Sequence, residues 1–259
     1  MLRKHAELLS KTLDVFVRGR DRSIGIQQLQ AILDSFKPLD VGLSEPLNNS
    51  GSSEDVVSNN SEPISYLHMY DCDRFTMGIF CIPGGSTIPL HDHPEMTVLS
   101  KLLYGKLHVR SFDWLASAPH GNNRYTQGDE SKAPLRVSPS FSLPKGSRPA
   151  MQVADKVMYP SSPTAVLFPD NGGVVHEFMA LTDCAILDVL SPPYNVAEGR
   201  DCTYYKELTV EGGHVYLYPC EAPDSFIVKA GTYSGPPISR ALASISPPPS
   251  SSPDSSSLL

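Results

Sequence analysis

The sequence predicts an all-β dominated protein, an antiparallel sandwich or barrel of short strands preceded by helices. Between about residues 64 and 230, short runs rich in β-branched and aromatic residues are separated by Gly, Pro, Ser and Asn, which is typical of such folds. Before residue 43, apolar residues recur with helical spacing instead. The even distribution of apolar runs over the later region favours one main core in a chain of 259 residues.

The N-terminal segment, residues 1–43, is predicted to be helical. Its apolar residues follow the i, i+3, i+4, i+7 pattern in two groups, namely Leu8, Leu9, Leu13 and Phe16, then Ile26, Leu29, Ile32, Leu33 and Phe36. Pro38 ends the second helix, because proline lacks the backbone donor that a helix needs. We expect both helices to pack on the outside of the barrel, and we assign no function to their apolar stripe.

The remaining segments follow in order along the chain. Residues 44–63 are polar and rich in turn-forming residues, which predicts a flexible surface loop. The barrel domain is expected over residues 64–234, in the runs "FTMGIFCIP", "TIPLHDH", "MTVLSKLLYG", "KLHVRSFDW", "MQVADKVMY", "TAVLFP", "HEFMALTDCAILDVL" and "HVYLYPC". A charged insertion, residues 116–134, predicts a long loop at one end of the barrel. The Pro/Ser-rich tail, residues 235–259, has too little apolar content to pack, so we expect it to be disordered.

The composition excludes several classes of protein. A net charge of −7 disfavours direct binding to nucleic acid. No apolar run reaches the roughly 18 residues of a membrane-spanning helix, and the N-terminus lacks the apolar region of a signal peptide. The five cysteines include no Cys-x-x-Cys pair, which predicts reduced thiols. We therefore expect an intracellular protein, a monomer by default, whose partner is a small molecule or another protein.

Two of the eight histidines, His91 and His93, lie one residue apart in an apolar run. Residues i and i+2 share one face of a strand but not of a helix, so the two imidazoles converge only if this segment is a strand. The third candidate is His176, which follows an Asn-Gly-Gly turn into a β-rich run. His214 also follows a Gly-Gly turn and is the main alternative as third ligand.

These histidines predict a metal site. A single buried histidine is more often a hydrogen-bonded core residue than a ligand, but two on one strand face, about 7 Å apart, need a common reason to be buried. Three neutral imidazoles would leave open positions on the metal, as in a relative of the two-His-one-carboxylate site of iron oxygenases. Zinc with a water would accept the same ligands, so the ligand set alone does not exclude hydrolysis or hydration.

The segment from Gly85 to Gly105 resembles the first cupin motif, a Gly, five residues, His-x-His and a closing Gly. The "GVVH" that ends at His176 resembles the Gly-x-x-His of the second motif. The resemblance implies a cupin double-stranded β-helix, a jelly-roll barrel. In the cupin motif a Glu follows four or five residues after His93 as a fourth ligand. This chain has Thr and Val there, and Glu95 comes too early to take that role.

A cupin with three histidines resembles the thiol dioxygenases, and longer segments are similar to the plant cysteine oxidase family, relatives of 2-aminoethanethiol dioxygenase. The segments are "ILDSFKPLDVGL", "LHDHPEMTVLSKLLYGKLHVRSFDW", "PDNGGVVHEF" and "AILDVLSPPYNVAEGRDCTYY", so the similarity runs from about residue 24 to 220. The resemblance implies one Fe(II) per chain, held by His91, His93 and His176, with O2 as co-substrate. The substrate thiol binds as thiolate and receives both oxygen atoms, giving a sulfinic acid without an external reductant.

The same resemblance implies the biological role. The substrates are proteins that begin with cysteine, such as group VII ethylene response factors, and oxidation marks them for the arginine N-degron pathway. The enzyme would thereby sense oxygen and control the hypoxia response, in the cytoplasm and nucleus. Neither nucleic acid nor a membrane is expected as a direct partner.

Asp188 and Tyr194 match positions implicated in the active site of the family, which implies that they orient the substrate or the ligands. Asp188 lies in an otherwise apolar run, where an unpaired carboxylate is costly. It could hold a substrate α-ammonium or a ligand imidazole N–H, and a structural ion pair is the alternative. Cys202 and Tyr204 resemble the pair that can crosslink in the animal 2-aminoethanethiol dioxygenase, but we predict no crosslink.

Two other functions remain as alternatives. A dioxygenase for free cysteine or cysteamine would need a closed pocket, with an Arg for the carboxylate of a free amino acid, and no such Arg stands out near the motifs. A non-catalytic cupin would serve as a binding module, with weak metal binding or none, and would not consume O2.

Overall fold

The computed structural model describes residues 2–18, 22–44, 63–115 and 142–238. Within these ranges the helices are α1 (Leu2–Phe16) and α2 (Arg22–Asp34), with the short 3-10 helices η1 (Pro38–Val41) and η3 (Val196–Glu198). The strands are β1 (Ile64–Asp71), β2 (Thr76–Ile82), β3 (Thr87–Asp92), β4 (Thr97–Tyr104), β5 (Leu107–Trp114), β6 (Arg148–Met158), β7 (Ala165–Leu167), β8 (Val175–Ala180), β9 (Cys184–Ser191), β10 (Tyr204–Thr209), β11 (Val215–Cys220) and β12 (Val228–Gly231). Strands therefore dominate, as predicted.

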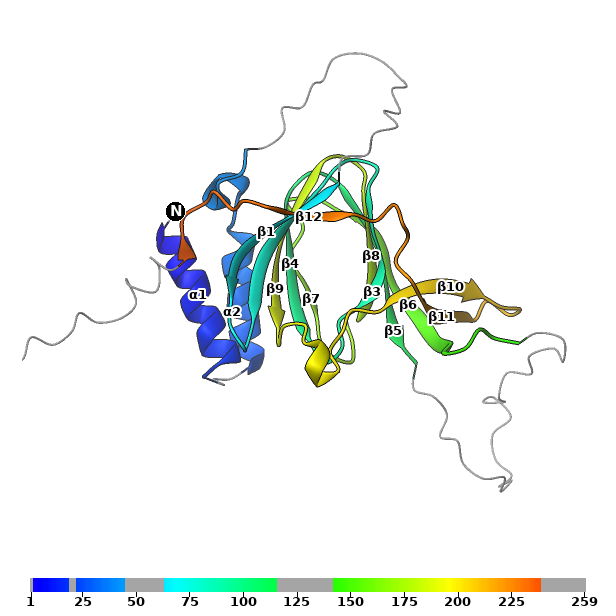
Figure 1. Ribbon diagram of the computed structural model, residues 1–259. Coiled ribbons are helices and arrows are strands. Elements are labelled where there is room, and N and C mark those ends of the chain that lie inside the picture. The colour runs from blue at the N-terminus through cyan, green and yellow to red at the C-terminus, as the bar shows by residue number, and fades with distance from the viewer. Residues whose placement is uncertain (1, 19–21, 45–62, 116–141, 239–259) are drawn as a thin grey trace, which may run out of the picture.

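The chain passes back and forth between two sheets, which is the path of a jelly roll. One sheet has the strand order β12-β1-β2-β9-β4-β7, and the other has the order β10-β11-β6-β5-β8-β3. Consecutive strands lie in opposite sheets from β2 to β5, and again from β7 to β10. A bridge between Tyr204 of β10 and His91 of β3 closes the second sheet on itself. The predicted cupin barrel is confirmed (Figure 1).

The sheet that contains β4 and β9 is covered on both faces, which explains why both strands are almost continuously apolar. Its outer face packs against α1 and α2, in a cluster that includes Leu9, Leu29 and Leu187 (Figure 1). Its inner face packs against the second sheet, in a cluster that includes Ile186 and Phe178. The helices thus lie outside the barrel, as predicted, and the interior between the sheets remains available for a site.

The structure differs from the sequence prediction at the beginning of the tail. Residues 235–238 pack against the N-terminal segment, where Ile238 is 3% exposed within the cluster of α1 and α2. One isoleucine after Gly-Pro-Pro carries no periodic signal, so the sequence does not reveal this contact. Residues 239–259, residues 45–62 of the predicted loop and the whole 116–134 insertion lie outside the described residues. In the part of the chain that the structure describes, no helix has the length and hydrophobicity to cross a membrane.

Candidate metal centre

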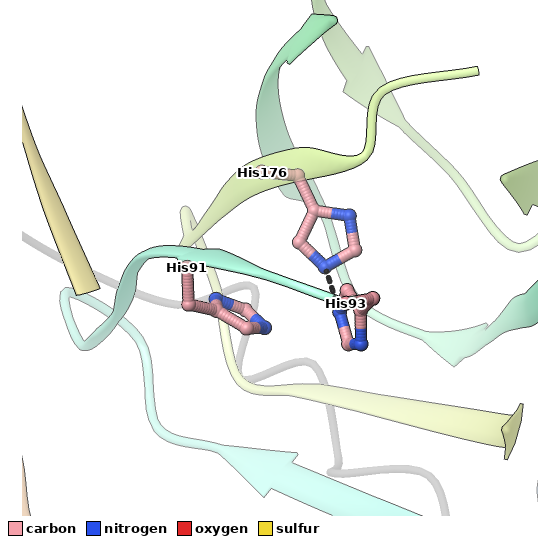
Figure 2. Close-up of side chains that lie close together, drawn as sticks. All are labelled: His91, His93 and His176. Atoms are coloured by element: carbon pink, nitrogen blue, oxygen red, sulfur yellow. Dashed lines mark hydrogen bonds between the residues drawn. The ribbon is translucent and has the colours of Figure 1, made fainter. Parts of the chain in front are cut away.

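Three buried histidines, from β3, the residue after it and the neighbouring strand β8, meet at the inner face of the barrel. His91 of β3 pairs in register with His176 of β8, and His93 follows directly after the end of β3. His91 is 8% exposed, His93 is 5% exposed and His176 is 6% exposed. Figure 2 shows the rings pointing into one space, and the possible ligand nitrogens all lie within 4.8 Å of one another. The structure therefore brings together the three histidines that the sequence predicts as ligands.

A tight turn after His93 directs the next acidic residue away from the cluster. The backbone N–H of Met96 donates to the carbonyl oxygen of His93 at 3.2 Å. Glu95 has a positive φ of 60° within this turn and is exposed. Among the described residues, the cluster consists of histidines alone and has no carboxylate as a fourth member.

The Nδ1 atoms of two histidines are held by hydrogen bonds. His91 Nδ1 lies 2.7 Å from the carbonyl oxygen of Pro89, which can only accept, so Nδ1 carries the proton. The Tyr194 hydroxyl donates its proton to the carbonyl oxygen of Asp92 at 2.8 Å, so it accepts the Nδ1–H of His93, also at 2.8 Å. In both rings the Nε2 lone pair is therefore free to bind a metal.

Two of the ligand nitrogens have the spacing of neighbouring ligands on one metal ion. The Nε2 atoms of His93 and His176 lie 3.0 Å apart, along the dashed line in Figure 2. Two nitrogens bound at about 2.1 Å with a right angle between the bonds would lie about 3 Å apart, whereas a tetrahedral angle would separate them by about 3.4 Å. The separation of this pair is therefore that of two nitrogens on one metal ion, and three imidazoles suit iron among other transition metals.

The imidazoles are neutral at neutral pH. Burial lowers the pKa of His91 to about 4. Burial, together with repulsion from the neighbouring imidazoles, holds the pKa of His93 and of His176 well below the ordinary value. Since a metal binds only the deprotonated imidazole nitrogen, protons do not compete for this site at neutral pH.

Asp188 is a buried carboxylate on the inner face of β9. It is 6% exposed and, because side chains alternate along a strand, it faces the interior like Ile186. Burial raises the pKa of Asp188 to about 7, although a hydrogen bond with Ser100 lowers it. Its Oδ1 atom has no hydrogen-bond partner among the described residues. A buried oxygen without a partner is costly, which leaves this atom available to a ligand that donates a hydrogen bond.

The Tyr66 side chain also lies near Asp188, and it is not among the residues predicted from the sequence. Gly78 lies directly opposite Asp188 on β2, and a Cβ at Gly78 would be 2.3 Å from the Tyr66 hydroxyl oxygen. Burial, and after it the charge of Asp188, raises the pKa of Tyr66 to about 12, so its hydroxyl stays protonated. The only sequence signal is a glycine inside a strand, which marks a close approach of another group.

Cys202 and Tyr204 lie next to the same site. The Cys202 thiol is hydrogen-bonded with the hydroxyls of Tyr194 and Tyr204. Burial raises the pKa of Cys202 to about 11, so the thiol is protonated at neutral pH. Cys202 is a free thiol in this structure, and our expectation that it forms no crosslink stays a prediction.

The other described histidines lie away from the cluster, namely His5, His68, His108 and His214. His214, the main alternative as third ligand, is exposed in the turn between β10 and β11. His120 lies outside the described residues.

Asp92 and its partners are not among the site residues predicted from the sequence. The Asp92 carboxylate accepts the backbone N–H of Thr203 at 2.9 Å and the hydroxyl of Tyr205 at 2.8 Å. These bonds tie the segment of His91 and His93 to β10. The signal is present in the sequence, because an acidic residue between two ligands on a strand must face away from them and needs its own partner.

Replacing Tyr194 by phenylalanine is expected to weaken Fe(II) binding about 10- to 100-fold. The variant keeps the ring but removes the oxygen that accepts the Nδ1–H of His93, so this imidazole loses its fixed orientation. The dissociation constant can be measured without oxygen, by competition with a chelator. Tyr218→Phe on β11 is the matched control and should leave it unchanged, and an unchanged constant in Tyr194→Phe would contradict the assignment.

Comparison with known proteins gives a match to one family model and to three relatives. A family model described as PCO_ADO matches residues 32–238. Plant cysteine oxidase 1 of Arabidopsis thaliana is 41% identical over 186 residues, which is 72% of this chain and 56% of that protein. Plant cysteine oxidase 2 of the same plant is 36% identical over 243 residues, covering 86% of this chain and 79% of that protein. Human 2-aminoethanethiol dioxygenase is 29% identical over 193 residues, covering 69% of this chain and 70% of that protein. The match thus spans little more than half of the first of these relatives.

Proposed function

The chain belongs to the PCO_ADO family, a family of thiol dioxygenases, and from this premise we propose that it oxidises the N-terminal cysteine of target proteins to cysteine sulfinic acid, with Fe(II) and O2. The observation that carries the proposal is the set of three buried, neutral histidines whose free nitrogens converge. Plant cysteine oxidases are named among the relatives, and this supports a cysteine thiol as the group that reacts.

The residues around the site would prepare it for iron. Hydrogen bonds to Pro89 and Tyr194 hold the rings of His91 and His93, and the absence of a carboxylate from the cluster of described residues leaves the full charge of a bound divalent ion. Such an ion would supply neighbouring positions for a substrate thiolate and for O2, so that both oxygen atoms can be added to sulfur.

Apolar side chains beside Tyr194 would limit the access of water. Met96, Val98 and Leu167 are buried in one cluster, against which Leu190 and Tyr194 pack. Val98 lies near the start of β4, and Leu190 lies near the end of β9. The cluster therefore lies on the C-terminal side of Asp188 along β9. Excluding water strengthens the electrostatic interactions of a bound thiolate and favours its oxidation over side reactions.

The charges of the interior support a substrate with a free amino group. Of all the Asp, Glu, Lys and Arg residues that the structure describes, only Asp188 and Lys101 are buried. The Lys101 ammonium is already bound to the carbonyl oxygens of Pro160 and Ser162, at 2.8 and 2.9 Å. Asp188 therefore remains as the buried charge with a free oxygen, and it matches the α-ammonium of an N-terminal cysteine rather than the carboxylate of a free amino acid.

The proposal also includes the protein substrates and the pathway in which they are degraded. We propose that the substrates are proteins with N-terminal cysteine, such as group VII ethylene response factors, and that the sulfinic acid marks them for the arginine N-degron pathway. Since O2 is a co-substrate, low oxygen would leave these proteins intact, which is how the enzyme would sense hypoxia. We expect it to act in the cytoplasm and nucleus, on protein substrates, without contact with nucleic acid or membranes.

Cysteamine is the second candidate substrate, because it has the amino group that Asp188 could bind and lacks a carboxylate. Relatives named 2-aminoethanethiol dioxygenase favour it. Free cysteine fits less well, because its carboxylate finds no free buried cation among the described residues.

The test is an incubation of Fe(II)-loaded protein in air with a peptide that begins Cys-Gly-Gly, with free cysteine and with cysteamine, followed by mass spectrometry. We expect the peptide to gain two oxygen atoms on its cysteine, much faster than either small thiol and only when O2 is present. Oxidation of cysteamine or cysteine alone would replace the protein substrate by a small thiol. If the iron-loaded protein oxidises none of them, the chain is a binding module.

A further inference from the structure

A carboxylate at the end of β5 holds the turn that carries His176. Asp113 Oδ1 accepts the backbone N–H groups of Gly173 and Val174 at 2.7 and 3.1 Å, and its Oδ2 accepts that of Gly172 at 3.1 Å. One carboxylate thus binds three consecutive backbone donors. Hydrogen bonds from backbone N–H groups to an ionised acceptor are about twice as strong as neutral ones.

The local conformation explains why a side chain is needed at this point. The β5–β8 ladder pairs Ser111 with His176 and ends one pair later. Beyond it, Gly172 and Gly173 have φ values of +88° and +92°, so the chain turns away and its N–H groups lose their partners on β5. The Asp113 side chain replaces those partners. It therefore fixes the backbone just before β8, which begins one residue before His176.

The same turn also holds His93. The backbone N–H of His93, which lies beyond β3, donates to the carbonyl oxygen of Val174 at 3.2 Å. Val174 is one of the three residues whose N–H groups bind Asp113. Asp113 is thus linked to the backbones of two of the three histidines, although it is not a member of their cluster.

We propose that Asp113 is a positioning residue for the metal centre, which sets the separation of the His93 and His176 nitrogens by holding the turn between residues 172 and 174. The inference rests on the proposed iron site and adds a residue to it. Asp113 acts on the ligands through the backbone. Its loss should therefore weaken metal binding and leave most of the fold intact.

The experiment compares Asp113→Asn with Asp155→Asn. Asparagine keeps the shape but has one acceptor oxygen and no charge, so it cannot satisfy three N–H groups. The control removes an exposed carboxylate on the neighbouring strand β6, where Asp155 pairs with His108. Fe(II) dissociation constants would be measured without oxygen by chelator competition, at a temperature where the metal-free variants are folded.

We expect Asp113→Asn to bind Fe(II) about 10- to 100-fold more weakly, and Asp155→Asn to stay within about twofold of wild type. The Co(II) absorption spectrum of Asp113→Asn should also change, because two ligand nitrogens move. An Asp113→Asn variant with the wild-type dissociation constant and Co(II) spectrum would overturn the inference. A wild-type protein that binds no Fe(II) would instead refute the proposed function.

A second measurement keeps the inference testable if the asparagine variant does not fold. In the wild-type protein, the amides of residues 172–174 should exchange with solvent far more slowly than those of a free peptide, because the carboxylate holds them. Exchange at the rate of a free peptide would show that Asp113 does not fix the turn.

Discussion

The variant His176→Ala is expected to lose Fe(II) binding by about a hundred- to a thousandfold, and with it the oxidation of thiols. Structural metal sites with four protein ligands have apparent binding free energies of roughly 10–16 kcal/mol, which is about 2.5–4 kcal/mol for each ligand. His176 Nε2 lies 3.0 Å from His93 Nε2, so its loss leaves two of the three converging nitrogens. The remaining pair would hold an ion more weakly.

This prediction can be checked by chelator competition and by the mass of a Cys-Gly-Gly peptide after incubation in air. His214→Ala is the matched control, because His214 is exposed in a turn and lies outside the cluster. It should bind iron and oxidise the peptide like the wild type. Because His176 stacks on Phe178 with 4.4 Å between the ring centroids, circular dichroism must show that His176→Ala is folded. Full activity in folded His176→Ala would exclude His176 as a ligand.

The fold was predictable because its main features are local in sequence. Alternating β-rich runs, two amphipathic helices and the spacing around His91, His93 and His176 are each visible in a short window. The position of Ile238 was not predictable, because its burial depends on a hydrophobic cluster that includes residues of helices more than 200 residues earlier. A single apolar residue has no pattern from which such a contact can be inferred.

The candidate site also has a part that the sequence predicts and a part that it does not. The histidines follow from spacing, whereas Asp92 and Asp113 bind backbone N–H groups of distant segments, residues 203 and 172–174. The residue types in those segments do not indicate these hydrogen bonds, because every residue except proline has the same backbone N–H group. Only the register of β3, β5, β8 and β10 brings these partners together.

The sequence leaves three roles open for Asp188, namely binding of a substrate ammonium, binding of a ligand imidazole and a structural ion pair. The Nδ1 atoms of His91 and His93 already bind Pro89 and Tyr194, so Asp188 is not needed to orient those rings. Its buried Oδ1 atom has no partner among the described residues. Both observations favour the role in which the carboxylate receives a hydrogen bond from the substrate ammonium.

Asp188→Asn is therefore expected to lower kcat/KM for a Cys-Gly-Gly peptide about 10- to 150-fold, since a hydrogen bond to a charged group contributes roughly 1.5–3 kcal/mol. The same peptide with an acetylated N-terminus has no ammonium and serves as the matched substrate control. It should react slowly with the wild type, and equally slowly with the variant. An equal loss on both peptides would instead mean that Asp188 positions the metal ligands.

The pH dependence gives an independent test of this role. Burial raises the pKa of Asp188 to about 7, so the ionised form that binds ammonium appears as the pH rises, and a bound divalent cation moves this step to lower pH. The substrate amine loses its proton above about pH 8. For the wild type, kcat/KM should therefore increase with pH up to about 7 or below and fall again above 8. Asparagine does not titrate, so Asp188→Asn should lose the increase on the acid side, and a variant that keeps it unchanged would assign that step to another group.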